Sequence, residues 1–163
     1  MAGIFMKYIV IYILTVITSL AFAIDDKDYN GKYDPARDSF ADFEAAKKDA
    51  QASGKLILVE FGGEWCVWCH RIEKFILANP EINSGIDDVF IFLKVNVSDD
   101  NKNDKFISQF PEIKGYPFFA ITDSSGVVIG SQNTGLLEKG KGYSAERFKE
   151  FIAKWKAVQA KQK

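Results

Sequence analysis

Cysteine and histidine are scarce in this sequence, which has two cysteines and one histidine among 163 residues. Both cysteines lie in one short motif, Cys66-Val67-Trp68-Cys69. A single pair excludes a framework of several disulfides, so the hydrophobic core must stabilise the fold. A structural zinc site needs about four ligands, and beyond the two thiols and His70 the chain has no other Cys or His. We therefore expect no metal.

The sequence also lacks an excess of charge of one sign. Lys and Arg number 21 and Asp and Glu number 22, which gives a formal net charge of −1. The basic bias that is typical of nucleic-acid binding is absent, so we expect no nucleic-acid partner. The length predicts one domain of ordinary size. No internal repeat or additional dimerisation segment is visible, and we expect a monomer.

No apolar run has the length of about 20 residues that a bilayer-spanning helix needs. The longest run covers residues 8–20, with Lys7 before it and Ala-Phe-Ala at positions 21–23 after it. A short apolar run that ends in a small-x-small sequence is typical of a cleaved signal peptide. We therefore predict that residues 1–23 direct export and are removed near Ala23. An uncleaved N-terminal membrane anchor is the alternative.

The chain is organised around residues 56–77, in which an apolar run meets an amphipathic run. Residues 56–61 predict a strand buried on both faces, interrupted only by Glu60. Two glycines follow, and from Cys69 onward apolar residues recur at helical spacing until Asn79 and Pro80. The cysteine motif therefore lies where a strand ends and a helix begins.

This position favours redox chemistry. The first turn of a helix has unpaired backbone N–H groups and the positive end of the dipole, which stabilise a thiolate at Cys66. A lowered thiol pKa makes that sulfur nucleophilic near neutral pH. Two intervening residues on a helical turn bring Cys69 within reach of a disulfide, so the pair can alternate between dithiol and disulfide.

The remaining chain alternates helical and strand patterns after an irregular, polar arm at residues 24–38, and residues 39–160 form the predicted domain. Four glycines, at positions 130, 135, 140 and 142, mark expected loops. The predicted elements are a helix from Ser39 to Gly54, a helical piece or loop at 80–86, an interior parallel strand at 89–97, a short helix at 104–110, a strand at 118–122, a turn at 123–126, a strand at 127–131 and a final helix capped by Ser144.

This order resembles the thioredoxin fold, an α/β fold with a central mixed sheet of about four strands flanked by helices. Glu64-Trp65-Cys66 resembles the thioredoxin active-site signature, and Gly115-Tyr116-Pro117 resembles the segment that contains the family's cis-proline. Val67 after the first cysteine, and Glu73 seven residues after that cysteine, resemble the motif of the C-terminal periplasmic domain of DsbD, a membrane disulfide reductant. The sequence WCVWCH at 65–70 is also similar to small exported thioredoxin-like proteins. The resemblance covers residues 40–155.

The resemblance implies three catalytic residues. Cys66 would be the exposed nucleophile that forms a mixed disulfide with a client, and Cys69 the resolving thiol. Glu60 occupies the place of the buried acid that thioredoxins keep beneath the pair, although they have Asp there. Burial raises the pKa of a carboxyl group, so Glu60 could exchange a proton with Cys69 near neutral pH. An inert structural role is the alternative for Glu60.

Four further residues are implied to contact clients. Pro117 would be cis and would place the backbone of Tyr116 against the disulfide, where an extended client segment can pair with it. Trp65 would shield the disulfide. Trp68 is a candidate for client contact, and a simple packing lid over the motif is equally open.

Two residues could tune the thiols. His70, when protonated, would favour a nearby thiolate and make the pair more oxidising. Glu73 lies four residues from Cys69 on the same face of the helix, so it could tune that thiol. The alternative for both residues is an ordinary solvated position on the helix.

The sequence therefore predicts an exported, periplasmic thiol–disulfide oxidoreductase that reduces protein disulfides and uses no cofactor other than its own disulfide. Its partners would be client proteins with disulfides or thiols, and a membrane electron donor of the DsbD type. The alternatives are an oxidant or isomerase of the same fold, and a non-catalytic client-binding module. Haem attachment at the CxxCH sequence is disfavoured, because the chain after residue 23 has no Met or second His as an axial ligand.

Overall fold

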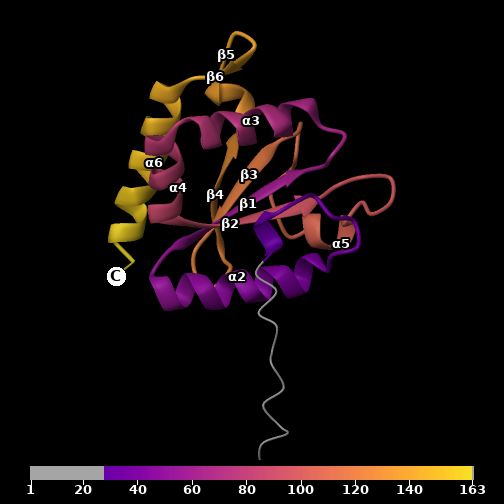
Figure 1. Cartoon of the computed structure of the whole chain (residues 1–163). Helices are drawn as coiled ribbons and strands as arrows, with labels where there is room; N and C mark the ends of the chain where they lie inside the picture. Colours follow the sequence, from indigo (N-terminus) through magenta and orange to yellow (C-terminus); the bar gives the residue numbers. More distant parts are fainter. Residues whose placement is uncertain (1–27, 163) are drawn as a thin grey trace, which may run out of the picture.

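The computed structural model describes residues 28–162. The predicted signal peptide, residues 1–23, and the first part of the arm lie outside the described residues. Within residues 28–162, no helix is both long and apolar enough to cross a membrane. The described chain folds into a central sheet with helices on both faces (Figure 1).

The sheet has four strands in the order β2-β1-β3-β4. Strand β1 pairs in parallel with β2 and antiparallel with β3, and β3 pairs antiparallel with β4. The predicted mixed sheet is therefore confirmed, but β2 lies at its edge and not in its interior as we expected. The strands are β1 (Leu56–Gly62), β2 (Phe90–Asn96), β3 (Phe118–Thr122) and β4 (Val128–Asn133).

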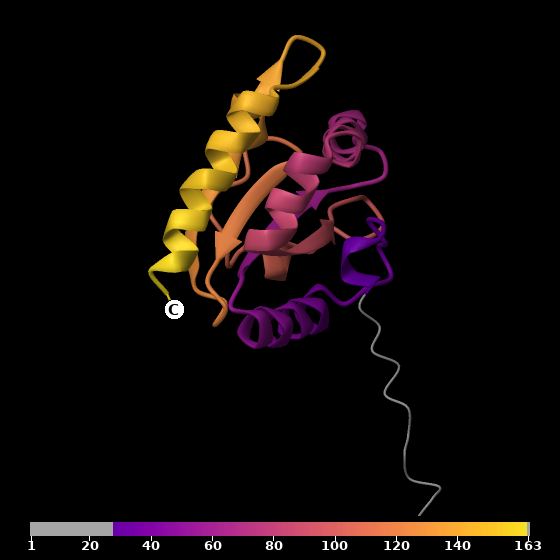
Figure 2. The same cartoon turned by 60° about the vertical axis from the view of Figure 1, so that its left-hand side comes forward.

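The two faces of β1 belong to two different cores, because successive side chains of a strand point to opposite faces. Leu56 and Leu58 join a cluster with the helices α3 (Val67–Ala78), α4 (Pro80–Val89) and α6 (Ala145–Ala160). Ile57, Val59 and Phe61 join a second cluster with α2 (Ser39–Ser53) and α5 (Asp104–Ile107). By this alternation Glu60 and Gly62 point to the face that α3 covers. Figure 2 shows α4 and α6 next to each other, apart from α2.

The helix ends follow from local capping. The Asp38 carboxylate accepts hydrogen bonds from the first-turn amides of α2, and Gly54 ends this helix in the left-handed region at φ 66°. The Ser144 hydroxyl caps α6 in the same way. Pro80 stands in the first turn of α4, where its missing N–H costs nothing. The segment that the sequence left as helix or loop is therefore a full helix.

Gly130 and Gly142 were expected in loops, but Gly130 lies within β4 and Gly142 lies within a short strand, β6 (Gly142–Tyr143). An ideal Cβ at Gly130 would be 2.5 Å from the Trp155 ring on α6, so this glycine makes room for the tryptophan. A further difference follows β4, where a 3₁₀ turn, η3 (Thr134–Leu137), leads into the short antiparallel strands β5 (Glu138–Lys139) and β6. The sequence did not predict this hairpin.

The N-terminal arm packs on the domain. Its described part starts with a 3₁₀ turn, η2 (Asp28–Asn30), and buries two tyrosines. Tyr29 joins the core between α2 and the sheet, and its hydroxyl donates a hydrogen bond of 2.8 Å to Asp49. Tyr33 is buried against the cysteine motif. The arm therefore belongs to the site as well as to the fold.

Candidate active site

Cys66 and Cys69 are joined in a disulfide at the start of α3, with a Cα–Cα distance of 5.2 Å. Cys66 is the N-cap residue of α3, and its sulfur accepts a hydrogen bond of 3.1 Å from the backbone N–H of Cys69. The same contact would stabilise a thiolate at Cys66 in the reduced protein, because an N–H group at a helix start favours negative charge.

The disulfide is more covered than the sequence suggested. We expected an exposed nucleophile, yet Cys66 is only 4% exposed and Cys69 only 1%. Tyr33 covers the pair together with the partly buried rings of Trp68 and Tyr116. A client disulfide must therefore reach a Cys66 sulfur that these aromatic rings largely cover.

Glu60 lies on β1 beneath α3 and is 1% exposed. Burial raises the pKa of Glu60 to about 7, and the Tyr33 hydroxyl and the positive charge of Lys94 limit this rise. Gly62 follows on the same face of β1, and an ideal Cβ there would be 2.6 Å from the Cys69 sulfur. The absence of a side chain at this position therefore allows Cys69 to pack closely over the strand that carries Glu60.

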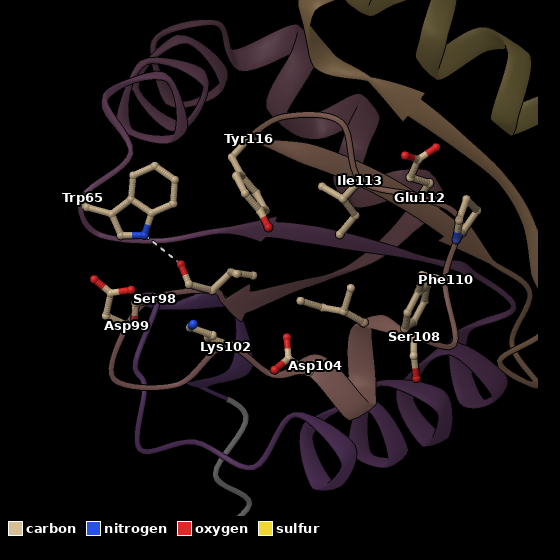
Figure 3. Close-up of a pocket in the computed structure, with 13 residues that line it drawn as sticks. Trp65, Ser98, Asp99, Lys102, Asp104, Ser108, Phe110, Glu112, Ile113 and Tyr116 are labelled. Carbon is tan, nitrogen blue, oxygen red and sulfur yellow. Dashed lines mark hydrogen bonds between the residues drawn. The ribbon is translucent and has the colours of Figure 1, made fainter.

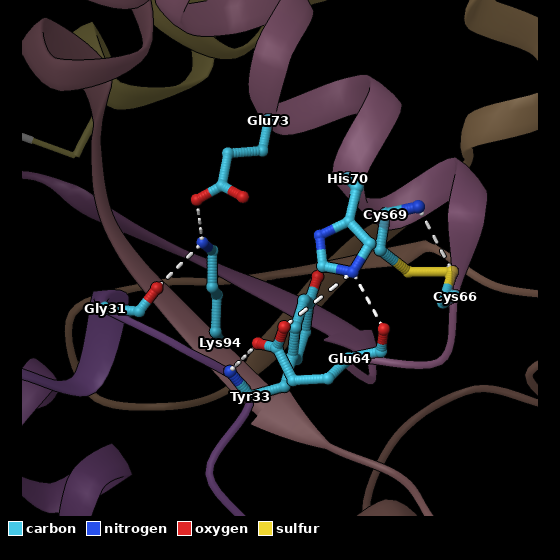
Figure 4. Close-up of polar contacts among 8 residues, drawn as sticks. All are labelled: Gly31, Tyr33, Glu64, Cys66, Cys69, His70, Glu73 and Lys94. Carbon is cyan, nitrogen blue, oxygen red and sulfur yellow. Dashed lines mark hydrogen bonds and ion pairs between the residues drawn. A yellow bond between two sulfur atoms is a disulfide. The ribbon is translucent and has the colours of Figure 1, made fainter.

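Glu73 forms an ion pair with Lys94, with Nζ 2.6 Å from Oε1 (Figure 4). Lys94 is buried on β2 and also donates a hydrogen bond of 3.0 Å to the Gly31 carbonyl oxygen of the arm. The negative charge of Glu73 adds to the raised pKa of Glu60. Glu73 is thus paired with Lys94 and acts on Glu60 through its charge, and its predicted tuning of Cys69 stays a prediction.

His70 points back to the loop before the motif. Its Nε2 lies 2.8 Å from the Glu64 carbonyl oxygen and 3.7 Å from a carboxylate oxygen of the same residue. The other carboxylate oxygen of Glu64 accepts a hydrogen bond of 3.0 Å from the Tyr33 backbone N–H (Figure 4). Glu64 thereby joins α3 to the arm, and the effect of His70 on the thiols stays a prediction.

Two aromatic residues mark the surface beside the disulfide. Trp65 is 57% exposed, donates a hydrogen bond of 2.7 Å from Nε1 to the Val97 carbonyl oxygen, and meets the Tyr116 ring edge-on at 5.6 Å. The Tyr116–Pro117 peptide bond is cis, and Pro117 is buried. Trp65, Val97 and Tyr116 line one side of a surface cavity.

Trp68 packs on its own domain. Its ring meets Tyr143 edge-on at 5.8 Å, and the Arg71 guanidinium lies 4.5 Å from the ring centroid. The ring is half-buried. These contacts agree with the packing lid that the sequence left open, and client contact by the exposed part of the ring stays a prediction.

The cavity beside Trp65 and Tyr116 has a volume of about 620 Å³ (Figure 3). Phe110 and Ile113 contribute further apolar surface to it. Its polar lining includes Asp99, Lys102, Asp104 and Glu112.

Within the described chain, no group of three or more His, Cys, Asp or Glu side chains could hold a metal ion.

Two residues of the site were missed by the sequence reading. Lys94 is a charged residue in an otherwise apolar strand, as Glu60 is. Two opposite charges in neighbouring apolar strands could have suggested that the two side chains lie close together. Tyr33 had no local signal, because an irregular arm does not reveal which side chain it buries.

A cysteine pair at the start of a helix, above a buried acid and beside a cis-proline, defines the class of thioredoxin-fold thiol–disulfide oxidoreductases. A family model described as Thioredoxin-like matches residues 38–124, which is more than half of the chain. The chain belongs to the thioredoxin-like family. Tyr33 and the arm as far as Arg37 precede the matched segment.

Individual relatives agree with this assignment. The thiol:disulfide interchange protein DsbD of Salmonella paratyphi A is 30% identical over 77 residues, which are 47% of this chain and 13% of that protein. This chain therefore matches only a small part of DsbD.

Among solved structures, a disulphide isomerase from Xylella fastidiosa Temecula1 has 25% identity and a TM-score of 0.64, covering 75% of this chain and 94% of that chain. The oxidised C-terminal domain of Neisseria meningitidis DsbD has 17% identity and a TM-score of 0.54. The match covers 72% of this chain and 96% of that chain. The latter likeness supports the fold alone.

Proposed function

We propose that this protein is an exported oxidoreductase that reduces protein disulfides by exchange through Cys66 and Cys69. The observation that carries the proposal is the Cys66–Cys69 disulfide at the start of α3, above a buried carboxyl with a raised pKa. The reducing direction rests on Val67, the first residue between the cysteines, which resembles the corresponding residue of the DsbD reductant domain. No cofactor other than the cysteine pair is required.

The proposed reaction has two exchange steps. The Cys66 thiolate attacks a client disulfide, which forms a mixed disulfide and releases one client thiolate. The Cys69 thiol then loses its proton, attacks the Cys66 sulfur, and releases the second client thiolate. Glu60 accepts the proton of Cys69, because a carboxyl with a pKa near 7 can take up and return a proton at neutral pH.

The client would bind beside the disulfide. We propose that an extended client segment pairs with the backbone at Tyr116 and Pro117, next to the exposed Trp65 ring. The two client thiolates leave with two electrons, so the protein ends each cycle as a disulfide. A membrane electron donor of the DsbD type would reduce it again in the periplasm. Cleavage near Ala23, or retention as an N-terminal anchor, would place it there.

The test is reduction of insulin disulfides by the purified protein with dithiothreitol as electron source. We expect catalysis by the wild type, and loss of catalysis in Cys66→Ser. Cys69→Ser should accumulate a mixed disulfide with insulin, because the resolving thiol is gone. Wild-type activity no greater than that of Cys66→Ser would contradict the proposal. It would favour the client-binding module that the sequence left open.

Isomerisation or oxidation of clients is the second candidate, because the Xylella structure with the higher similarity is named as a disulphide isomerase. Equilibration of the protein with glutathione measures its redox potential, which distinguishes a reductant from an oxidant. A potential near about −270 mV would resemble thioredoxin, and one near about −120 mV would resemble a strong oxidant.

A further inference from the structure

The arm residue Tyr33 touches the redox centre directly. It is 3% exposed and forms a buried cluster of its own with Cys66 and Cys69. An ideal Cβ on Gly62 would lie 2.6 Å from the Cys69 sulfur and 2.9 Å from the Tyr33 hydroxyl oxygen. The sulfur and the hydroxyl therefore border the same small space above β1.

The Tyr33 hydroxyl also faces Glu60. It is close enough to lower the pKa of that carboxyl, while burial and the Glu60 charge raise the pKa of Tyr33 itself. Within residues 28–162, however, Tyr33 Oη and Glu60 Oε1 have no hydrogen bond of ordinary geometry. Buried polar atoms without such a bond are rare and costly, so this pair requires an explanation.

The oxidised state of the cysteine pair explains why the Tyr33 hydroxyl lacks a hydrogen bond. The structure is oxidised, and a disulfide sulfur carries no proton. On reduction, Cys69 becomes a thiol or thiolate next to the Tyr33 hydroxyl, and a thiol can donate and a thiolate can accept a hydrogen bond. The buried hydroxyl would then gain Cys69 as a hydrogen-bond partner and would lie between two titratable groups, Cys69 and Glu60.

We propose that the Tyr33 hydroxyl relays the proton between Cys69 and Glu60. The inference rests on the proposed function and adds to it a residue from outside the family-matched segment. As Cys69 attacks the mixed disulfide, its S–H proton passes to Tyr33 Oη, and the original Tyr33 proton passes to the Glu60 carboxylate. Tyr33 ends neutral, Glu60 ends protonated, and the electron pair left on Cys69 forms the new bond to Cys66. The client sulfur leaves as a thiolate.

Contacts from three elements hold the relay in place. The Tyr33 N–H donates to Glu64, and Lys94 from β2 donates to the Gly31 carbonyl oxygen two residues earlier. The Lys94 ammonium also lies 5.5 Å from the Tyr33 ring centroid and is paired with Glu73 of α3. Apart from their effect on each other, the charged groups that act on Glu60 or Tyr33 are Lys94, Glu73 and Glu64. The Glu60 charge also acts on Tyr143.

The experiment compares Tyr33→Phe with Tyr29→Phe in the full chain. Both changes remove one buried hydroxyl from the arm, but the Tyr29 hydroxyl binds Asp49 away from the cysteines. The readout is the rate at which a mixed disulfide between Cys66 and an insulin-derived peptide is resolved, measured from pH 5 to 9 in rapid-mixing experiments.

We expect Tyr33→Phe to slow resolution about 10²-fold, the lower end of the range for a positioned proton-transfer group. It should also remove the dependence of the rate on the protonation of Glu60 near pH 7. Tyr29→Phe should change neither. A wild-type rate and pH profile in Tyr33→Phe would overturn the relay. Failure of the wild type to reduce insulin would instead contradict the proposed function.

A measurement on the wild type keeps the relay testable if Tyr33→Phe folds poorly. In the wild type, a relay through Tyr33 moves two protons in the resolution step, so the rate should depend quadratically on the deuterium fraction of the solvent. A linear dependence would overturn the proposal. Where Tyr33→Phe folds, it can also be combined with Glu60→Gln. If Tyr33 and Glu60 act in one relay, Tyr33→Phe should slow resolution no further in the Glu60→Gln background. Losses of rate that multiply in the double variant would also overturn the relay.

Discussion

At the residue scale, the raised pKa of Glu60 makes stability depend on pH. Its pKa rises from about 4.5 to about 7 on folding. A carboxyl with a raised folded-state pKa favours the folded state fully below pH 4.5, and this contribution is lost as the pH rises through 7. The buried charge is therefore a cost at pH 8 that is absent at pH 4.

We expect Glu60→Gln to remove this dependence. Relative to the wild type, the free energy of unfolding of the oxidised variant should increase by about 3 kcal/mol between pH 4 and pH 8, at about 1.4 kcal/mol for each pKa unit. Urea unfolding at both pH values measures this difference. A difference that stays constant with pH would show that Glu60 titrates as an ordinary exposed carboxyl.

Lys94 provides a second test at this scale, because its charge lowers the pKa of Glu60. Lys94→Met should move the pKa of Glu60 above about 7, as measured by NMR titration of the side-chain carboxyl carbon. Lys74→Met changes an exposed lysine of α3 and serves as the control. An unchanged Glu60 pKa in Lys94→Met would mean that the ammonium acts on Glu73 alone.

At the scale of elements, features with a signal in one short segment of sequence could be predicted. Features that depend on contacts between distant segments could not. Capping and periodicity predicted α2, β1, α3 and α6, because their signals lie within one short segment. The loop assigned to Gly130 was wrong, because only the Trp155 ring from a distant helix explains the missing side chain. The cysteines and Glu60 lie in one segment and were found. Tyr33 and Lys94 depend on long-range packing and were not.

The packing at Gly130 gives a test of this explanation. In Gly130→Ala the new methyl group would meet the Trp155 ring, whereas in Gly142→Ala it would have nothing within 4 Å. We expect Gly130→Ala to lower the free energy of unfolding by about 1–3 kcal/mol, the usual cost of overpacking. Gly142→Ala should have a much smaller effect. Equal effects in denaturant unfolding would contradict the assigned contact.

At the scale of the whole molecule, redox direction and stability are linked. A reductant has a disulfide that is more stable in the folded protein than in the unfolded chain. We therefore expect the oxidised protein to unfold at a higher urea concentration than the dithiol form. The difference should be roughly 1.4 kcal/mol for each 30 mV by which its potential lies below that of the unfolded chain. A more stable dithiol form would indicate an oxidant.

The arm joins the chain's earliest described residues to its chemistry. Tyr33 covers the sulfur pair, yet it precedes the segment that matches the family. Loss of the chain before Ser39 would therefore leave the cysteine motif and the cis-proline segment intact and would remove one of the three aromatic rings that cover the disulfide.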